Sequence, residues 1–167
     1  MIEGYKGFNF DFTNRYGKKF QTGKIYKANG NIEFKKNGFH MCTNLEDIFR
    51  YFDAINDEII ICKVKGNGKV SSYNDEYNGY YDMYCVEEIE IIKQLTREEI
   101  IEIGLNLNDF RVIRFIKGYK LTNEEIEQFK TTFKDWNHVL KAISYYQEGN
   151  KQVYEQNYLK LTKRKRL

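Results

Sequence analysis

The sequence lacks proline altogether, and its three cysteines form no C-x-x-C pair. The absence of proline excludes a proline-rich linker. An odd number of unpaired cysteines argues against a disulfide framework and is typical of reduced thiols in a cytoplasm. No apolar run approaches the roughly 20 residues that a membrane-spanning helix needs. The first ten residues also lack the basic and then apolar pattern of a signal peptide. We therefore expect a cytoplasmic protein with no membrane partner.

The positive charge is concentrated at the C-terminus. The net charge is +3, but the last eight residues carry five lysines and arginines and no acid, so the rest of the chain sums to −2. A basic tail can contact RNA phosphates or acidic proteins, and a solvated terminus has the same composition. The tail residues considered for partner binding are Lys163, Arg164, Lys165 and Arg166. The near-neutral body is not typical of a uniformly basic nucleic-acid-binding domain.

The apolar pattern changes near residue 95 and predicts an α+β fold. Before this point, short alternating or β-branched runs predict a mixed or antiparallel β-sheet with one helix. After it, helical spacing predicts a helical C-terminal half. The predicted strands are residues 4–10, 23–28, 31–36, 38–42, 58–66 and 86–95, and the predicted later helices are 97–104, 107–118, 123–133, 136–147 and 150–160.

Helix-capping signals support this division. Thr96 with Glu99 and Thr122 with Glu125 have the spacing of a capping box. Glycines near three predicted helix ends fit the C-terminal position that glycine favours: Gly104, Gly118 and Gly149. We predict a β-rich domain over 1–95, a helical region over 96–160 that can also pack with the sheet as one unit, and a basic tail over 161–167.

The segment NGFHMCTNLEDIFRYF, residues 37–52, is the most suggestive for chemistry. Thr43 and Glu46 have capping-box spacing, and an apolar stripe follows them, so a strand is predicted to lead into an amphipathic helix. On that strand His40 and Cys42 share a face. Two ligands do not make a metal site, so we expect no metal. The two side chains would lie about 7 Å apart, too far for a direct catalytic dyad.

A third reading of this corner is an anion site. The free N–H groups of residues 44–46, beside His40 and Thr43, could bind a phosphate or carboxylate at the helix N-terminus. The alternative is a corner that satisfies itself, with Thr43 as the cap and His40 bound to a carbonyl. The sequence leaves both readings open.

Five tyrosines cluster in SSYNDEYNGYYDMYCVEE. Gly79 and the Asn and Asp content favour a loop over a helix. Tyrosines in a loop suit protein binding or base stacking, and they also suit simple cover of a sheet edge. The candidates for partner contact are Tyr73, Tyr77, Tyr80 and Tyr81.

Over residues 4–95 the chain resembles uncharacterised small domains that are common in phages and prophages. The resemblance rests on the YKGF opening, the turn FQTGKIY, the GFH-C strand with its following helix, and a final Ile/Lys-rich strand. It implies phage or mobile-element origin and no particular activity.

The layout of YKGF and GFHMCTNLEDIFRYF is also similar to ADP-ribosyltransferases of the poly-ADP-ribose polymerase type. That resemblance implies an NAD cleft with Lys6 and Gly7 at the NAD-contacting pair and Tyr51 at the helix tyrosine. His40 would stand where a tyrosine normally stacks on nicotinamide. Lys6 departs from the usual His or Arg, and the catalytic glutamate has no clear match. The candidates for that carboxylate are Asp82, Glu87 and Glu88.

The leading functional hypothesis is a binding inhibitor of a host defence macromolecule, similar to anti-CRISPR proteins. Its partner would be a host protein or ribonucleoprotein effector, its mechanism steric, and it would need no cofactor. An ADP-ribosyltransferase-like enzyme or NAD binder is the alternative, with Lys6 and His40 as catalytic candidates. RNA or DNA binding through the tail and tyrosines is a second alternative.

Overall fold

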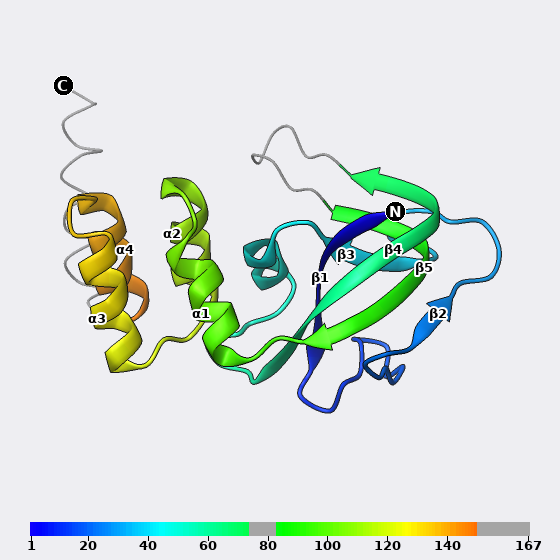
Figure 1. Ribbon diagram of the computed structural model, residues 1–167, viewed down its shortest axis with the longest axis horizontal. Coiled ribbons are helices and arrows are strands. Elements are labelled where there is room, and N and C mark those ends of the chain that lie inside the picture. The colour runs from blue at the N-terminus through cyan, green and yellow to red at the C-terminus, as the bar shows by residue number, and fades with distance from the viewer. Residues whose placement is uncertain (74–82, 150–167) are drawn as a thin grey trace, which may run out of the picture.

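Five antiparallel strands form the N-terminal part of the computed structural model, which describes residues 1–73 and 83–149 (Figure 1). They are β1 (Ile2–Asn9), β2 (Ile25–Lys27), β3 (Phe39–Cys42), β4 (Ile59–Tyr73) and β5 (Met83–Gln94). The strand order is β2-β5-β3-β1-β4, and β5 also pairs with β4. The last pairing closes β5, β3, β1 and β4 into a four-stranded barrel, with β2 on its outer edge. The predicted α+β fold with an N-terminal antiparallel sheet is confirmed.

Strand β4 closes the barrel because it is long enough to pair with two neighbours. Residues 59–66 pair with all of β1, and residues 62–73 pair with β5. The apolar, β-branched run at the start of β4 favours an extended backbone. Gly68 then adopts a left-handed φ of 76°, where the register with β5 shifts between Asn67 and Val70. Such a bulge bends the strand, here in the part of β4 that pairs with β5 beyond the end of β1.

Aromatic side chains from the segment after β1 fill one end of the barrel. Phe12 stacks on the fully buried Phe8 with 4.9 Å between ring centroids, and Phe20 lies 5.0 Å from Phe8. Phe20 also contacts Phe39 of β3 edge-on. Nine buried residues form this interior cluster: Phe8, Phe20, Phe39, Met41, Cys62, Val64, Val86, Ile89 and Ile91. The barrel interior is therefore a packed core and not a ligand cavity.

A short 3-10 helix packs against the outside of the barrel, and four α-helices extend the molecule beyond it. They are η1 (Leu45–Arg50), α1 (Arg97–Leu105), α2 (Asp109–Gly118), α3 (Asn123–Thr132) and α4 (Asn137–Tyr146). Figure 1 shows η1 between α2 and the barrel, with α3 and α4 at the far end. A second apolar cluster runs from Ile61 and Met83 on the strands, through Ile48 of η1, to Phe115 and Ile143 of the helices. The sheet and the helices thus share one continuous core.

The helix predictions are confirmed to within two residues at each end, apart from 150–160, which lies outside the described residues. Both later capping boxes are present, with Thr96 and Thr122 accepting from the backbone N–H of Glu99 and Glu125. Gly104 lies near the end of α1 as expected, one residue before its last residue. A Cβ atom at this position would come within 2.7 Å of the Phe115 ring.

Two predictions before residue 95 are also corrected. Residues 31–36 form turns and not a strand, because the Asn37 side chain binds the carbonyls of Asn29 and Asn31 and folds the segment back on itself. The helix after β3 is a six-residue 3-10 helix, and Asn44, not Thr43, is its N-cap. Its predicted apolar stripe is present, with Leu45 and Ile48 buried.

Candidate functional site

Lys6 lies at the seam between β1 and β3, where the barrel is least well paired. These strands share a single residue pair, Tyr5 with Cys42. Lys6 points to the same side of β1 as Phe8, and its Nζ donates to the His40 carbonyl at 2.6 Å. The carbonyl thus gains a side-chain donor where the β1–β3 ladder has ended. Burial lowers the pKa of Lys6 from 10.5 to about 8.

The His40 ring lies on the opposite face of the sheet from the barrel interior. Its Nε2 accepts a hydrogen bond from the backbone N–H of Lys35 at 3.1 Å, and its ring meets Phe34 edge-on at 5.1 Å. Lys35 has a left-handed φ of 66°, so this bond holds a strained turn in place. Burial, helped by the charges of Lys6 and Arg15, lowers the pKa of His40 and favours the neutral ring that can accept this bond.

Because Gly7 has no side chain, η1 and the residues that follow η1 can pack directly on β1. A Cβ atom at this position would fall 2.7 Å from Ile48 and 2.9 Å from Phe52. The face of β1 that bears Gly7 is therefore covered by side chains, and Lys6 lies on the opposite face. Lys6, Gly7 and His40 are close in space, but the structure does not bring them together around an open cleft.

The three thiols are buried and free of disulfides. Burial is the main cause that raises the pKa of Cys42 and of Cys62 to about 12. It also raises the pKa of Cys85, whose Sγ donates to the Asn37 carbonyl at 3.2 Å. A thiol with a raised pKa is a poor nucleophile at neutral pH. The arrangement therefore gives no support to cysteine catalysis at the β3–η1 corner.

Two carboxylates lie at the start of η1, where the sequence suggests a binding site for an anion. Glu46 and Asp47 lie in the first turn of η1 with side chains 0% and 3% exposed. Arg111 of α2 donates from Nε and Nη2 to the two carboxylate oxygens of Glu46. Arg114 donates from Nη1 to Asp47 at 3.0 Å. Burial raises the pKa of Asp47 in spite of these donors. Of the two readings that the sequence leaves open, this arrangement favours the corner that satisfies itself, because an incoming anion would meet two buried acids.

The sequence alone does not predict these two ion pairs. The available signal was the spacing of Arg111 and Arg114, which places both on one face of α2. The adjacent acids at 46 and 47 lie between Leu45 and Ile48 of the apolar stripe, and no local signal distinguishes a buried acid there from an acid that caps the helix. Only the packing of α2 against η1 reveals the partners.

The remaining candidates lie apart from one another. Tyr51 is the exposed C-cap of η1. Glu88 is paired across strands with Lys27 of β2, and Glu87 accepts from the backbone N–H of Lys69. Tyr73 ends β4 opposite Met83, so the start of the tyrosine cluster is strand. The other candidates lie outside the described residues: Tyr77, Tyr80, Tyr81, Asp82, Lys163, Arg164, Lys165 and Arg166.

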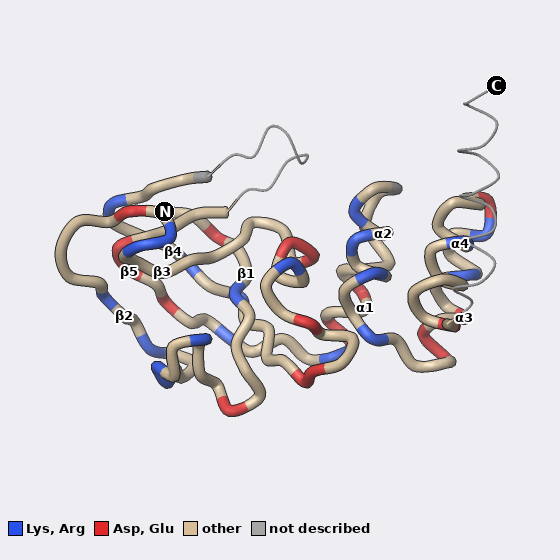
Figure 2. Tube along the Cα trace, turned by 180° about the vertical axis from the view of Figure 1, so that it is seen from behind, with Lys and Arg blue, Asp and Glu red and all other residues tan. Residues whose placement is uncertain are grey.

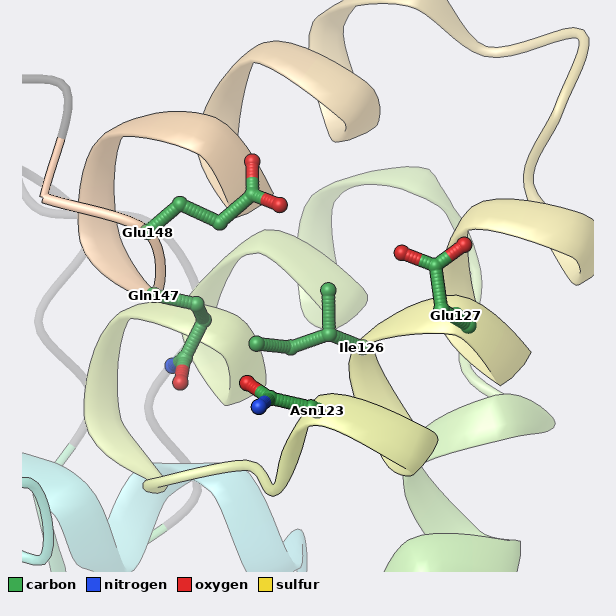
Figure 3. Close-up of a pocket in the computed structure, with 5 residues that line it drawn as sticks. All are labelled: Asn123, Ile126, Glu127, Gln147 and Glu148. Carbon is green, nitrogen blue, oxygen red and sulfur yellow. The ribbon is translucent and has the colours of Figure 1, made fainter.

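A shallow hollow of about 520 Å³ lies far from these residues, between α3 and the end of α4 (Figure 3). It is lined by Asn123, Ile126, Glu127, Gln147 and Glu148. Gln147 is already engaged, because it binds the Tyr119 carbonyl at 2.8 Å and accepts from the Leu121 N–H at 3.0 Å. Lys130 bridges the two glutamates. The hollow therefore offers few unengaged polar groups to a ligand.

Within residues 1–73 and 83–149, no group of three His, Cys, Asp or Glu side chains is placed to hold a metal ion. No helix in these ranges has the length and apolar character needed to cross a membrane.

Comparison with known proteins identifies one family. No curated protein and no solved structure matches the chain significantly. Residues 2–103 match a domain of unknown function, DUF7666. The match covers the barrel, η1 and most of α1, and α2–α4 follow it. Its extent is close to residues 4–95, over which the sequence resembles uncharacterised small domains, but it carries no link to phages. The chain belongs to the DUF7666 family.

Proposed function

We propose that the protein acts by binding a macromolecule and not by catalysis, as a steric inhibitor of a host defence protein or ribonucleoprotein. The proposal that it is not a catalyst rests on one observation: its reactive side chains already form hydrogen bonds or ion pairs within the protein. Lys6 holds the His40 carbonyl, and the His40 ring holds the Lys35 N–H. Glu46 and Asp47 are bound by arginines. Groups that stabilise the fold in this way are poorly placed to turn over a substrate.

Exposed aromatic side chains support the binding role. Phe10, Tyr16 and Phe110 are 74%, 82% and 78% exposed. Large aromatic side chains are typical anchors of protein interfaces, where they add contact area at low entropic cost. The choice of a defence system as target rests on the resemblance to phage-type domains, and the tyrosines at 73–81 and the basic tail remain the proposed contacts.

The binding mechanism predicts a stoichiometric effect. The full chain is titrated into purified CRISPR–Cas effector complexes, and residual nuclease activity is measured at several incubation times. A steric inhibitor should reach full effect near one copy per effector and should not act further with time. Inhibition that progresses with time at a substoichiometric dose would contradict the proposal. Failure to inhibit any effector would contradict the choice of target.

The NAD-dependent alternative is tested separately. A transferase or NAD binder should gain thermal stability in saturating NAD. Because Ile48 and Phe52 cover Gly7, we expect no shift in melting temperature and no labelled product from radioactive NAD. His40→Gln tests the same point, since it should leave stoichiometric inhibition intact once folding is verified. An NAD-dependent thermal shift that His40→Gln removes would favour the enzyme.

A further inference from the structure

Basic and aromatic side chains gather on the segment that closes one end of the barrel. Residues 10–32 contain five of the 27 lysines and arginines of the chain but only one of its 24 acids, Asp11. Figure 2 shows the basic residues of this segment and of β2 at the end of the molecule farthest from α3 and α4. Residues 10–32 therefore carry an excess of four positive charges, which is greatest before β2, because Glu87, Glu88 and Glu90 of β5 lie beside that strand.

The tip of this segment is a rigid turn. The Asn14 side chain accepts from the backbone N–H groups of both Tyr16 and Lys18 at 3.0 Å. The Asn14 backbone N–H donates to the Lys18 carbonyl at 3.0 Å, and its carbonyl accepts from Gly17 at 2.9 Å. Gly17 supplies the left-handed φ of 77° that closes the turn. Arg15 and Tyr16 are therefore held outward, with Tyr16 82% exposed.

Lys18 anchors the turn to the barrel. Its amine lies 4.9 Å from the Phe39 ring and 5.6 Å from the Tyr26 ring, within the range of cation–π attraction. Tyr26 belongs to β2, so the same contact sets the turn beside the strand that Lys24 precedes. The exposed residues Arg15, Tyr16, Lys19 and Lys24 form what we call the basic turn.

We propose that the basic turn binds single-stranded nucleic acid. Arg15, Lys19 and Lys24 would contact phosphates, and the Tyr16 ring would stack on a base. Proteins that bind single strands combine cations along the backbone with aromatic platforms for the bases, and stacking is tolerant of sequence. An acidic protein surface would also pair with the cations, so competition between polyglutamate and oligonucleotide separates the two occupants. The assignment does not depend on the proposed function.

The test is fluorescence anisotropy of the full chain with labelled 20-nucleotide oligouridine and oligothymidine across a range of salt concentrations. Replacing Arg15, Lys19 and Lys24 together with Gln should lower the affinity at least about tenfold. It should also reduce the slope of log affinity against log salt by about 2, since each phosphate contact on a single strand contributes about 0.7. Tyr16→Ala should lower affinity roughly fivefold to a hundredfold and leave the slope unchanged.

Two controls separate this surface from general charge. Lys120, Lys134 and Lys141 are exposed on the helical side, and their joint replacement by Gln removes the same charge. A tail variant replaces Lys163, Arg164, Lys165 and Arg166 with Gln. Absence of binding, equal loss in the helical control, or loss confined to the tail variant would overturn the proposal. Competition by polyglutamate as strong as that by unlabelled oligonucleotide would overturn it too, in favour of an acidic protein. Circular dichroism verifies the fold of each variant.

Discussion

Replacing Lys6 with Met should change how the stability of the protein depends on pH. A pKa that falls from 10.5 in the unfolded chain to about 8 in the folded chain corresponds to about 3 kcal/mol. The cost of holding a charged amine is present in full below pH 8. Between pH 8 and 10.5 the unfolded chain keeps a proton that the folded chain has lost. The free energy of unfolding should therefore rise with pH, by up to about 1.4 kcal/mol per pH unit.

Lys6→Met removes this contribution but also removes the donor to the His40 carbonyl. Leaving a buried carbonyl without a donor costs about 1–3 kcal/mol at every pH. At pH 7 the two effects oppose each other, so the variant should lie within about 2 kcal/mol of wild type. By pH 10 the amine of Lys6 in the folded wild type is neutral, so most of the cost of burying its charge is gone. Relative to the wild type, the variant should therefore be less stable at pH 10 than at pH 7 by about 2–3 kcal/mol.

The measurement is urea unfolding of both proteins from pH 7 to 10, in reductant and at fixed ionic strength. The raised pKa values of Cys42 and Cys62 act in the opposite direction above pH 9, because the unfolded thiols ionise first. They act equally on both proteins and cancel in the difference. Lys134→Met, at an exposed position, is the matched control and should follow the wild type. A difference between wild type and Lys6→Met that does not change with pH would refute the reasoning.

Three substitutions test other parts of the framework by the same unfolding assay. Arg111→Met should lower the free energy of unfolding by about 3–5 kcal/mol, because it leaves the carboxylate of Glu46 buried and unpaired. Glu46→Leu should lower it less, since the half-exposed side chain of Arg111 can turn to water, and equal losses would argue against this asymmetry. Gly104→Ala should destabilise by about 1–3 kcal/mol despite the better helix propensity of alanine, because the new methyl group meets Phe115 at 2.7 Å; a stabilised variant would contradict that packing. Thr96→Ala should cost about 1 kcal/mol through loss of the cap of α1, and no measurable change would mean that the cap is not formed in solution.

The strands and helices were largely predictable because their signals are local. The β-branched run at the start of β4 and the capping threonines of α1 and α3 each act within a few residues. Thr43 and Glu46 carry the same capping-box signal as Thr96 and Glu99, yet the outcome differs. Arg111, 65 residues away in the chain, takes the Glu46 carboxylate. A local pattern cannot report a competitor that only tertiary packing supplies.

The candidate site was harder to predict because burial reverses the meaning of its residues. A lysine beside a glycine on a strand suggests an exposed residue that contacts a ligand. The alternation of side chains along β1, however, places Lys6 on the same side as Phe8, facing the barrel. The sequence suggests that His40 binds a ligand or acts as a base. In the structure its ring accepts a hydrogen bond from the backbone N–H of Lys35, which lies in a turn without regular secondary structure. Residues of one type can serve chemistry or architecture, and solvent access decides between the two.

The position of the β3–η1 corner explains why its polar residues serve architecture. One apolar cluster fills the barrel, and a second lies between the barrel and the helices. The corner separates them, so a polar group there is shielded on both sides and must find a partner within the protein. Glu46 and Asp47 reach across to α2, while Lys6 reaches through the seam to β3. A corner that joins two cores in this way has little freedom to open for a substrate. Recognition is then left to the outer surface, where the basic turn combines exposure with a fixed geometry.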